Sequence, residues 1–216
     1  MSSVLSQLSY VEIEAFSGTL GWRFDDRLSV EMLESINSFA TDDFRSLFMS
    51  PRRTVSVNRF EIATEMVRWQ DVCQWDEDET FLIESLPEFC TKVEAVLSKY
   101  SLRLSTEDEF EVACGGDLFP WGNKVPPGTP DDTEFTGHNM PNQFGVKLNS
   151  NPYNCELVKD YLKLSDGGES IHGYYPWPIP WLSFCPAYRY LQAVLDECFF
   201  ETLDETYIRP VKLAAR

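Results

Sequence analysis

Hydrophobic and polar positions alternate loosely over residues 1–24, and this period of two predicts one or two short strands. After Ser29 the apolar positions of residues 30–48 recur every three or four residues, which predicts an amphipathic helix with one core-facing stripe. Residues 54–62 return to alternation and predict a half-buried strand. The first part of the chain therefore combines short strands with one helix.

Two further helices are predicted from their start signals. Thr64 precedes a helical pattern over residues 65–74, and Ser85 precedes a proline and an apolar stripe that ends near Tyr100. Between them, the acidic run at residues 75–79 is typical of a solvated loop, which is far commoner than an ion site.

The clearest local signal lies in residues 102–123, after a short predicted strand. Thr106 and Glu109 have the spacing of a capping box, in which each side chain bonds the other residue's backbone N–H. Gly115-Gly116 then predicts the end of the helix, because glycine accepts the left-handed conformation that follows many helices. Residues 119–123, FPWGN, predict an aromatic turn.

Two long segments contain four prolines each and show no period, at residues 124–143 and 171–190. A loop as long as the first is either functional or packed across the surface. The second cannot form a central strand or a helix interior, because proline lacks the N–H group that both require. We therefore expect residues 171–190 to lie over the surface or to line a pocket.

The remaining segments predict short elements. Residues 144–148 are a possible strand, residues 155–164 mix apolar and polar positions, and residues 191–203 could be a helix or a loop. Residues 206–213 predict a final strand. No repeat or linker divides the chain, so we expect one α+β domain over residues 1–216.

Composition narrows the classes of function. The chain has 216 residues, of which 43% are hydrophobic and 14% aromatic, enough for a folded core. Its net charge is −17, which disfavours nucleic-acid binding and suits either an ordinary acidic surface or a basic protein partner. Neither a run of about 18 apolar residues nor a signal-peptide pattern is present, so we expect no membrane association and a cytoplasmic location.

The cysteines and histidines give no metal signature. Six cysteines are scattered without any CxxC pair and are expected to be mostly small buried hydrophobes: Cys73, Cys90, Cys114, Cys155, Cys185 and Cys198. His138 and His172 are the two histidines, which excludes a site built from many histidines.

Four blocks, in order, resemble the formylglycine-generating enzyme family, also called the sulfatase-modifying factor domain, a relative of the C-type lectin fold. They are RRTVSVNRFEIATEMVRW (52–69), LRLSTEDEFEVACGGDLFPWGN (102–123), MPNQFGV (140–146) and YIRPVKL (207–213). The second block is specific, and the order of all four strengthens the others. The resemblance implies an α+β core over residues 51–216 with short strands, few helices and long irregular loops. Residues 1–50 would then be an extension or added elements.

The same resemblance implies that the family's metal chemistry is incomplete here. Catalytic members bind copper(I) through two cysteines about five residues apart; Cys185 could stand for the second, but residues 179–181 offer no thiol for the first. Near the family's calcium block only the carboxylate of Glu156 is kept, so we expect no calcium. The iron-dependent sulfoxide synthase branch needs histidines from an added domain, which two histidines do not supply.

We therefore expect a non-catalytic module that binds a protein partner, which the charge suggests is basic. A toxin or effector that the protein neutralises would be one such partner. The candidate contact residues are aromatic or basic and lie in the proline-rich segment: Tyr174, Tyr175, Trp177, Trp181, Tyr188 and Arg189. For each, core or loop packing is the plainer interpretation. The alternatives are a copper-dependent oxidase that uses Cys185 and a lectin-type site for a carbohydrate or small ligand.

Overall fold

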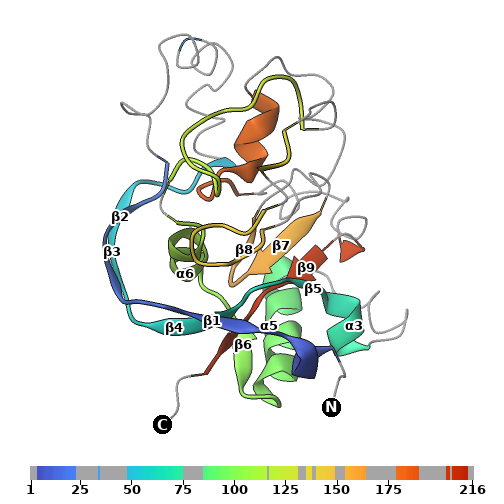
Figure 1. Cartoon of the computed structure of the whole chain (residues 1–216). Helices are drawn as coiled ribbons and strands as arrows, with labels where there is room; N and C mark the ends of the chain where they lie inside the picture. Colours follow the sequence, from blue (N-terminus) through green and yellow to red (C-terminus); the bar gives the residue numbers. More distant parts are fainter. Residues whose placement is uncertain are drawn as a thin grey trace.

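The described part of the chain is an α+β structure with several small sheets (Figure 1). The computed structural model describes residues 4–22, 34, 48–74, 85–115, 117–130, 135–137, 140–148, 154–163, 179–189, 203–204 and 206–213. The strands are β1 (Tyr10–Ile13), β2 (Phe16–Leu20), β3 (Arg53–Val57), β4 (Phe60–Ala63), β5 (Val67–Arg68), β6 (Leu102–Leu104), β7 (Cys155–Val158), β8 (Tyr161–Lys163), β9 (Thr206–Ile208) and β10 (Pro210–Lys212). The helices are η1 (Leu5–Gln7), α3 (Trp69–Cys73), α5 (Leu86–Ser98), α6 (Glu107–Ala113) and η3 (Ile179–Phe184).

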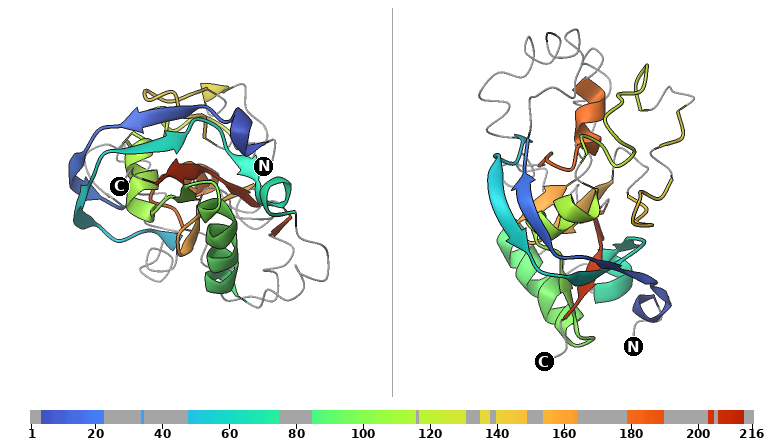
Figure 2. Two further views of the ribbon diagram at one scale, coloured as in Figure 1. Left: turned by 90° about the horizontal axis from the view of Figure 1, so that it is seen from below. Right: turned by 60° about the vertical axis from the view of Figure 1, so that its left-hand side comes forward.

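A long antiparallel ribbon forms one side of the fold. β1 pairs with β4 and β2 pairs with β3, and the register is the same on both sides of the interruption, since Ile13 faces Phe60 and Phe16 faces Val57. The two further views show this ribbon curving beside α6 (Figure 2). The strands predicted in residues 1–24 and 54–62 are thus confirmed, each divided into two pieces.

Two four-stranded sheets share the last segment of the chain. One has the order β1-β4-β10-β6 and the other the order β5-β9-β7-β8, in which β7 and β9 are parallel. The predicted final strand is therefore confirmed but is divided between the sheets, and Arg209 lies between its halves β9 and β10. Residues 155–164 contain β7 and β8 as an antiparallel pair.

The first sheet separates two hydrophobic clusters. Leu102 and Leu104 pack with the buried face of α5, which includes Phe89 and Val93. On the other face, Ile62 and the apolar residues of α6 belong to a second cluster. Each helix thus covers its own side of the sheet, and α6 lies close to the β2–β3 ribbon (Figure 1).

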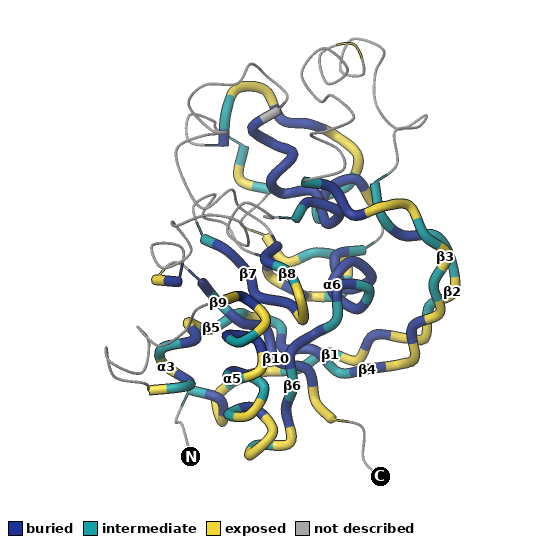
Figure 3. Tube along the Cα trace, turned by 180° about the vertical axis from the view of Figure 1, so that it is seen from behind, coloured by how far each residue is buried: buried dark blue, intermediate teal, exposed yellow. Residues whose placement is uncertain are grey.

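A third cluster is built largely from irregular segments, and it corrects the predicted surface position for the described part of residues 171–190. Residues 180–188 are all buried, and the segment that contains them packs around Trp181 and Tyr188 instead of lying over the surface. The short helix η3 accommodates Pro180, because a 3-10 turn needs few backbone donors. Long stretches of the tube in this upper part of the molecule are buried although it contains little regular structure (Figure 3).

Three local predictions differ from the structure or fall outside it. Thr64 does not cap a helix, because residues 67–68 first pair with β9 and α3 begins only at Trp69. Residues 144–148 contain no strand; a turn at residues 142–145 comes first. The predicted helix at residues 30–48, the acidic run and residues 191–202 lie outside the described residues, apart from residues 34 and 48.

The helices described above do not include one that is long and apolar enough to cross a membrane.

Candidate functional site

Helix α6 begins with the capping box that the sequence predicts. The Thr106 hydroxyl accepts a hydrogen bond from the backbone N–H of Glu109 at 3.2 Å, and the Glu109 carboxylate accepts one from the backbone N–H of Thr106 at 2.9 Å. Arg103 also pairs with Glu109 at 2.6 Å. The helix is followed by Gly115 at a φ of +105°, as predicted.

Side chains of α6 form the centre of a buried group of charges. Glu107 and Glu111 are one helical turn apart and therefore lie on the same face of the helix. Two like charges at this spacing repel each other, so their burial requires cations from elsewhere in the chain. We call the resulting group the α6 charge network; it consists of Arg53, Glu107, Asp108, Glu111, Lys163 and Arg189.

Lys163, the last residue of β8, is the most deeply buried cation of the network. Its side chain has 0% exposure, and its Nζ lies 2.7 Å from Glu107 Oε1 and 3.4 Å from Glu111 Oε1. It also donates to the carbonyl oxygen of Pro186 at 3.0 Å. All of its recorded partners are acceptors, which satisfies an ammonium group that burial would otherwise disfavour.

Arg189 reaches the network from the end of the proline-rich segment. Its guanidinium binds Glu107 through two hydrogen bonds, one of them from Nε at 2.6 Å, and lies 4.1 Å from the centre of the Tyr161 ring. Burial alone would raise the pKa of Glu107, but the hydrogen bonds from Arg189 and the charge of Lys163 outweigh it and lower this pKa to about 2. Glu107 is therefore ionised at neutral pH.

Glu111 joins the β2–β3 ribbon to the helix. It accepts hydrogen bonds from the backbone N–H of Gly21 at 2.8 Å and from the Ser50 hydroxyl at 2.7 Å. Arg53 lies 3.2 Å from Glu111 and bonds Asp108 through two nitrogens. Gly21 has a φ of +90°, and a Cβ there would lie 2.1 Å from the Pro51 carbonyl oxygen, so only glycine fits this contact.

Four residues that border segments not described in the structure lie at or near this network: Trp22, Phe48, Lys163 and Arg189. The backbone N–H of Trp22 donates to the Ser50 carbonyl at 2.9 Å, and the backbone N–H of Arg189 donates to the Phe48 carbonyl at 2.7 Å. Lys163 and Arg189 are themselves network members. Lys163 and Arg189 thus bond the helix directly, whereas Trp22 and Phe48 are joined to it through Ser50 and Arg189.

A second buried ion pair joins the two sheets. Arg209 and Glu156 both have 0% side-chain exposure and form two hydrogen bonds, of 2.7 and 3.0 Å. Arg209 also donates to the carbonyl oxygens of Ala63 and Lys147. The carboxylate of Glu156 therefore has a direct structural role, and these bonds link segments far apart in sequence.

Asn142 links another of the sequence blocks to α6. Its side-chain nitrogen donates to the Ala113 carbonyl at 2.6 Å, and its side-chain oxygen accepts from the N–H groups of Phe144 and Val146. Gln143 donates to the carbonyl of Gly115 at 3.1 Å. The turn that follows the long loop is thus fixed to the end of the helix.

Trp181 and Tyr188 are not surface residues, which corrects the expectation that they belong to an exposed binding loop. Both have 0% exposure. Trp181 donates to the Gly128 carbonyl and packs edge-on against Trp121 and Phe135, so it fixes part of the long loop at residues 124–143. A fold with few helices and strands must fill its core from its loops, and these two residues do so here.

The other predicted contact residues divide into two groups. Arg189 is half-buried, and its guanidinium is directed to Glu107 and Tyr161 instead of to solvent. Tyr174, Tyr175 and Trp177 lie outside the described residues, as does Cys198.

Cys185 lies in the aromatic cluster and has an unreactive environment. It is buried, and burial is the main cause that raises the pKa of its thiol to about 12. Very little thiolate is present at neutral pH, whereas thiolate is the form that binds copper(I) or attacks a substrate. Within the part of the chain that is described, no three His, Cys, Asp or Glu side chains are grouped as a metal site.

Sequence reasoning missed most of the α6 charge network. The sequence indicated only the capping box and the glycine stop for this helix, and Lys163 and Arg53 carried no local signal. The spacing of Glu107 and Glu111 on a helix with a buried face was the available clue, since it implies that cations must approach. Which cations would do so depends on contacts between segments 50 to 80 residues apart.

A search against models of protein families finds no match to this chain, and a search of curated proteins finds no significant match.

Proposed function

We propose that this protein is a non-catalytic binding module with a formylglycine-generating-enzyme-like fold, and that its acidic surface engages a basic protein partner. The observation that carries this proposal is the distribution of charge between the interior and the surface. The copper-dependent alternative has no comparable support, because it needs a thiolate at Cys185.

Among the described residues, cations and carboxylates of the interior ion pairs are equal in number. Five cations pair with five buried or half-buried carboxylates: Arg53, Arg103, Lys163, Arg189 and Arg209 with Glu107, Asp108, Glu109, Glu111 and Glu156. Removing five of each sign from the 35 acidic and 18 basic residues leaves 30 acidic and 13 basic residues elsewhere. The whole net charge of −17 is therefore carried outside this interior set, where it can attract a basic surface over a distance of about 10 Å at moderate salt.

The α6 charge network supports a scaffold role for the centre of the fold. Its paired charges tie Lys163 and Arg189 to one helix, and backbone hydrogen bonds join Trp22 to Ser50 and Phe48 to Arg189, so these four positions have a fixed place in the fold. Binding proteins commonly place contact residues on loops that a rigid scaffold positions. Tyr174, Tyr175 and Trp177 remain proposed contact residues, whereas the burial of Trp181 and Tyr188 assigns them to the scaffold.

The fold assignment is supported by bonds between the sequence blocks that suggested it. Arg209 of the last block bonds the Ala63 carbonyl of the first, and Asn142 of the third bonds the Ala113 carbonyl of the second. Residues that act together in one structural unit are expected to show such mutual contacts. The α+β architecture with short strands is compatible with the same assignment.

The proposal is tested by capturing partners from the native host with the tagged protein and then measuring the affinity of the purified partner at several salt concentrations. We expect a basic protein whose affinity falls steeply as salt rises. A variant in which exposed carboxylates such as Glu12 and Glu65 are replaced by glutamine should bind more weakly. Failure to retain any partner, or an affinity that salt does not change, would contradict the proposal.

A further inference from the structure

The outer strand of the antiparallel ribbon, β1 followed by β2, forms an open sheet edge. β1 is the end strand in the order β1-β4-β10-β6, and β2 pairs with β3 alone among the described residues. Residues 10–20, which we call the β1–β2 edge, follow the outer path of the ribbon beside β4 and β3 (Figure 2). They include neither lysine nor proline, and their register with β3 and β4 is unbroken, so the lysine, proline and bulge that commonly protect an edge are missing from it.

The register shows which backbone groups of this edge point away from the ribbon. The backbone N–H of Thr64 donates to the Ser9 carbonyl at 2.9 Å, so these two residues form a hydrogen-bonded pair across the ribbon. In antiparallel strands such residues alternate with residues whose N–H and C=O groups point to the other side. The register therefore directs outward the backbone groups of alternate residues: Tyr10, Glu12, Phe16, Gly18 and Leu20. Within the described parts of the chain, no backbone hydrogen bond outside the ribbon is recorded for these five residues.

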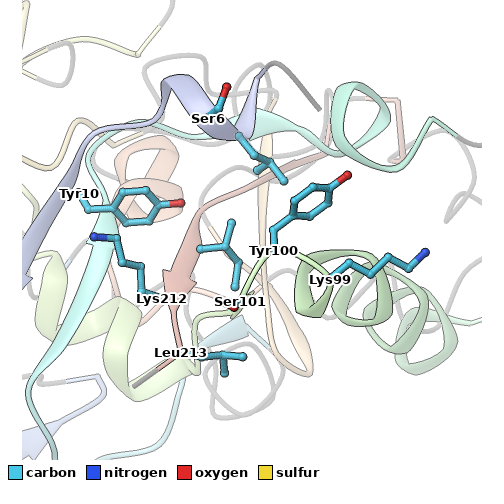
Figure 4. A pocket seen from close by; sticks show the side chains of 9 residues that line it. Ser6, Tyr10, Lys99, Tyr100, Ser101, Lys212 and Leu213 are labelled. Atoms are coloured by element: carbon cyan, nitrogen blue, oxygen red, sulfur yellow. The ribbon is translucent and has the colours of Figure 1, made fainter. Parts of the chain in front are cut away.

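The side chain of Tyr10 lies over the face of the sheet and not over its edge. The Nζ atom of Lys212, from β10, lies 4.7 Å from the centre of the Tyr10 ring. The close-up shows the ring directed from β1 toward Tyr100, across a pocket of about 480 Å³ near the end of α5 (Figure 4). Glu12, which follows on the edge, is exposed. The outward backbone groups beside it are therefore within reach of an added strand.

The charges along this edge favour a basic strand. Lys212 of β10, Glu61 of β4 and Glu12 of β1 lie in one row across the sheet, and Lys212 pairs with Glu61 at 2.5 Å. Glu12 is directly opposite Glu61, and like charges in this position repel each other. Arg59 lies 3.6 Å from Glu12, but both side chains are more than half exposed, so this pair is weak. A cation on a neighbouring strand would complete the alternation of charge.

We propose that the β1–β2 edge binds an extended, basic segment of the partner by antiparallel strand addition, with lysine or arginine side chains beside Glu12 and Glu14. The inference rests on the proposed function for the basic character of the partner, and it adds the surface and the mode of binding. Backbone hydrogen bonds supply affinity in this mode, and side chains supply preference. A second copy of the chain fits less well, because residues 4–22 contain two carboxylates and no basic residue, so like charges would meet.

The proposal is tested with the ¹⁵N-labelled full chain and a synthetic peptide of about ten residues in which lysine and threonine alternate, a length that matches the edge. Amide hydrogen exchange of Glu12, Phe16 and Gly18 should slow when the peptide binds, because their N–H groups gain acceptors. The amides of Val11 and Ser17 are bonded across the ribbon already and should change little. An absence of protection at the three outward amides would overturn the proposal.

N-methylated peptides of equal charge separate strand pairing from general attraction. In antiparallel pairing, the residue opposite Glu12 has its side chain on the same face and its N–H directed at the edge. The lysine N–H groups therefore donate to the edge, whereas the threonine N–H groups face solvent. N-methylation of two central lysines should weaken binding at least about tenfold, and N-methylation of two central threonines should have a much smaller effect. Equal effects of the two modifications would contradict strand addition.

A pair of double variants locates the site on the protein. Glu12→Gln with Glu14→Gln should weaken peptide binding roughly two- to tenfold, because two cross-strand ion pairs are lost. Glu88→Gln with Glu94→Gln, on α5, changes the net charge equally and should have less effect. Salt-dependent binding with equal losses for both double variants would overturn the edge as the site and leave the proposed function in place. Protection of the edge by the peptide, without capture of any basic partner from the host, would support the site and contradict the proposed function.

Discussion

Arg209 shows how one residue can join segments from the whole length of the chain. It occupies the junction between β9 and β10, is fully buried, and bonds Glu156 and the carbonyl oxygens of Ala63 and Lys147. A buried guanidinium is stable only when its donors are satisfied, and here four hydrogen bonds are recorded for it. The packing of the two sheets against each other therefore depends on the Arg209–Glu156 ion pair.

Removal of one partner from this pair should strongly destabilise the protein. Arg209→Met leaves Glu156 buried without its cation, and we expect a loss of about 3–5 kcal/mol in the free energy of unfolding, measured by urea denaturation. Lys212→Gln is the matched control: the Lys212–Glu61 pair is 43% and 44% exposed, and its loss should cost less than about 1 kcal/mol. Equal losses for the two variants would show that burial of the pair does not matter.

Single residues differ in how far the sequence predicts their role. Thr106, Glu109 and Gly115 act on backbone groups within a few residues, so local spacing was enough to predict the capping box and the helix end. Glu156 was recognised as a retained carboxylate, but its partner Arg209 is 53 residues away. No local pattern encodes a pairing at that separation.

At the scale of elements, α6 begins with a capping box that local residues form, and it also binds cations from distant segments of the chain. The capping box satisfies two backbone donors at its first turn, and the carboxylates of Glu107 and Glu111 bind cations from three other segments: Arg53, Lys163 and Arg189. A seven-residue helix is too short to be stable by itself in water, so packing and these ion pairs must maintain it. Loss of its cap should therefore lower the stability of the whole protein and not only that of the helix.

Thr106→Ala should lower the stability of the protein by about 1 kcal/mol, because the backbone N–H of Glu109 loses its acceptor. For a chain of this length, that corresponds to a decrease of roughly 2–4 °C in the melting temperature, measured by circular dichroism. Thr106→Ser keeps a hydroxyl at the same position and should retain most of the stability. If serine and alanine were equally destabilising, the cap would not be the cause.

Elements that depend on tertiary pairing were predicted less well. Residues 67–68 form a strand because β9 lies beside them, and this displaces the start of α3 from Thr64 to Trp69. The described part of the proline-rich segment contains no central strand, as predicted, and its burial favours the core packing that the sequence left open beside a surface position. Proline limits backbone pairing without limiting burial, and the aromatic rings around Trp181 provide the apolar surface that makes residues 180–188 a core.

At the scale of the whole molecule, the balance of interior charges makes stability depend on pH. The pKa of Glu107 is lowered to about 2 from an ordinary value of 4.5, and Arg103 together with the cap lowers the pKa of Glu109 against the effect of burial. A carboxylate with a lowered pKa stabilises the folded state fully above its unfolded value. This stabilisation is lost as the pH falls from about 4.5 toward 2.

We expect the wild-type free energy of unfolding to decrease over this acid range, with a contribution from Glu107 on the order of 3 kcal/mol. Glu107→Gln cannot titrate, so it should be less stable at neutral pH and lose less stability on acidification. Urea denaturation at a series of pH values gives both quantities. A variant with the same pH dependence as the wild type would contradict the assigned role of Glu107.

The fold class followed from the sequence because short strands, capped helices and turns are local features. The surface charge also followed from composition alone. The interior pairing of charges did not follow from composition, since four of its five ion pairs join residues that are 53 to 82 positions apart. The proposal that the acidic residues attract a basic partner therefore combines a property of the sequence with a property of the structure.

The most direct test of this account is the affinity of the captured and purified partner, measured by isothermal titration calorimetry as a function of salt concentration. A partner attracted by a net charge of −17 should bind at least about tenfold more weakly when the salt concentration rises well above the physiological value. An affinity that stays constant over the same range would contradict the claim that the acidic surface drives binding.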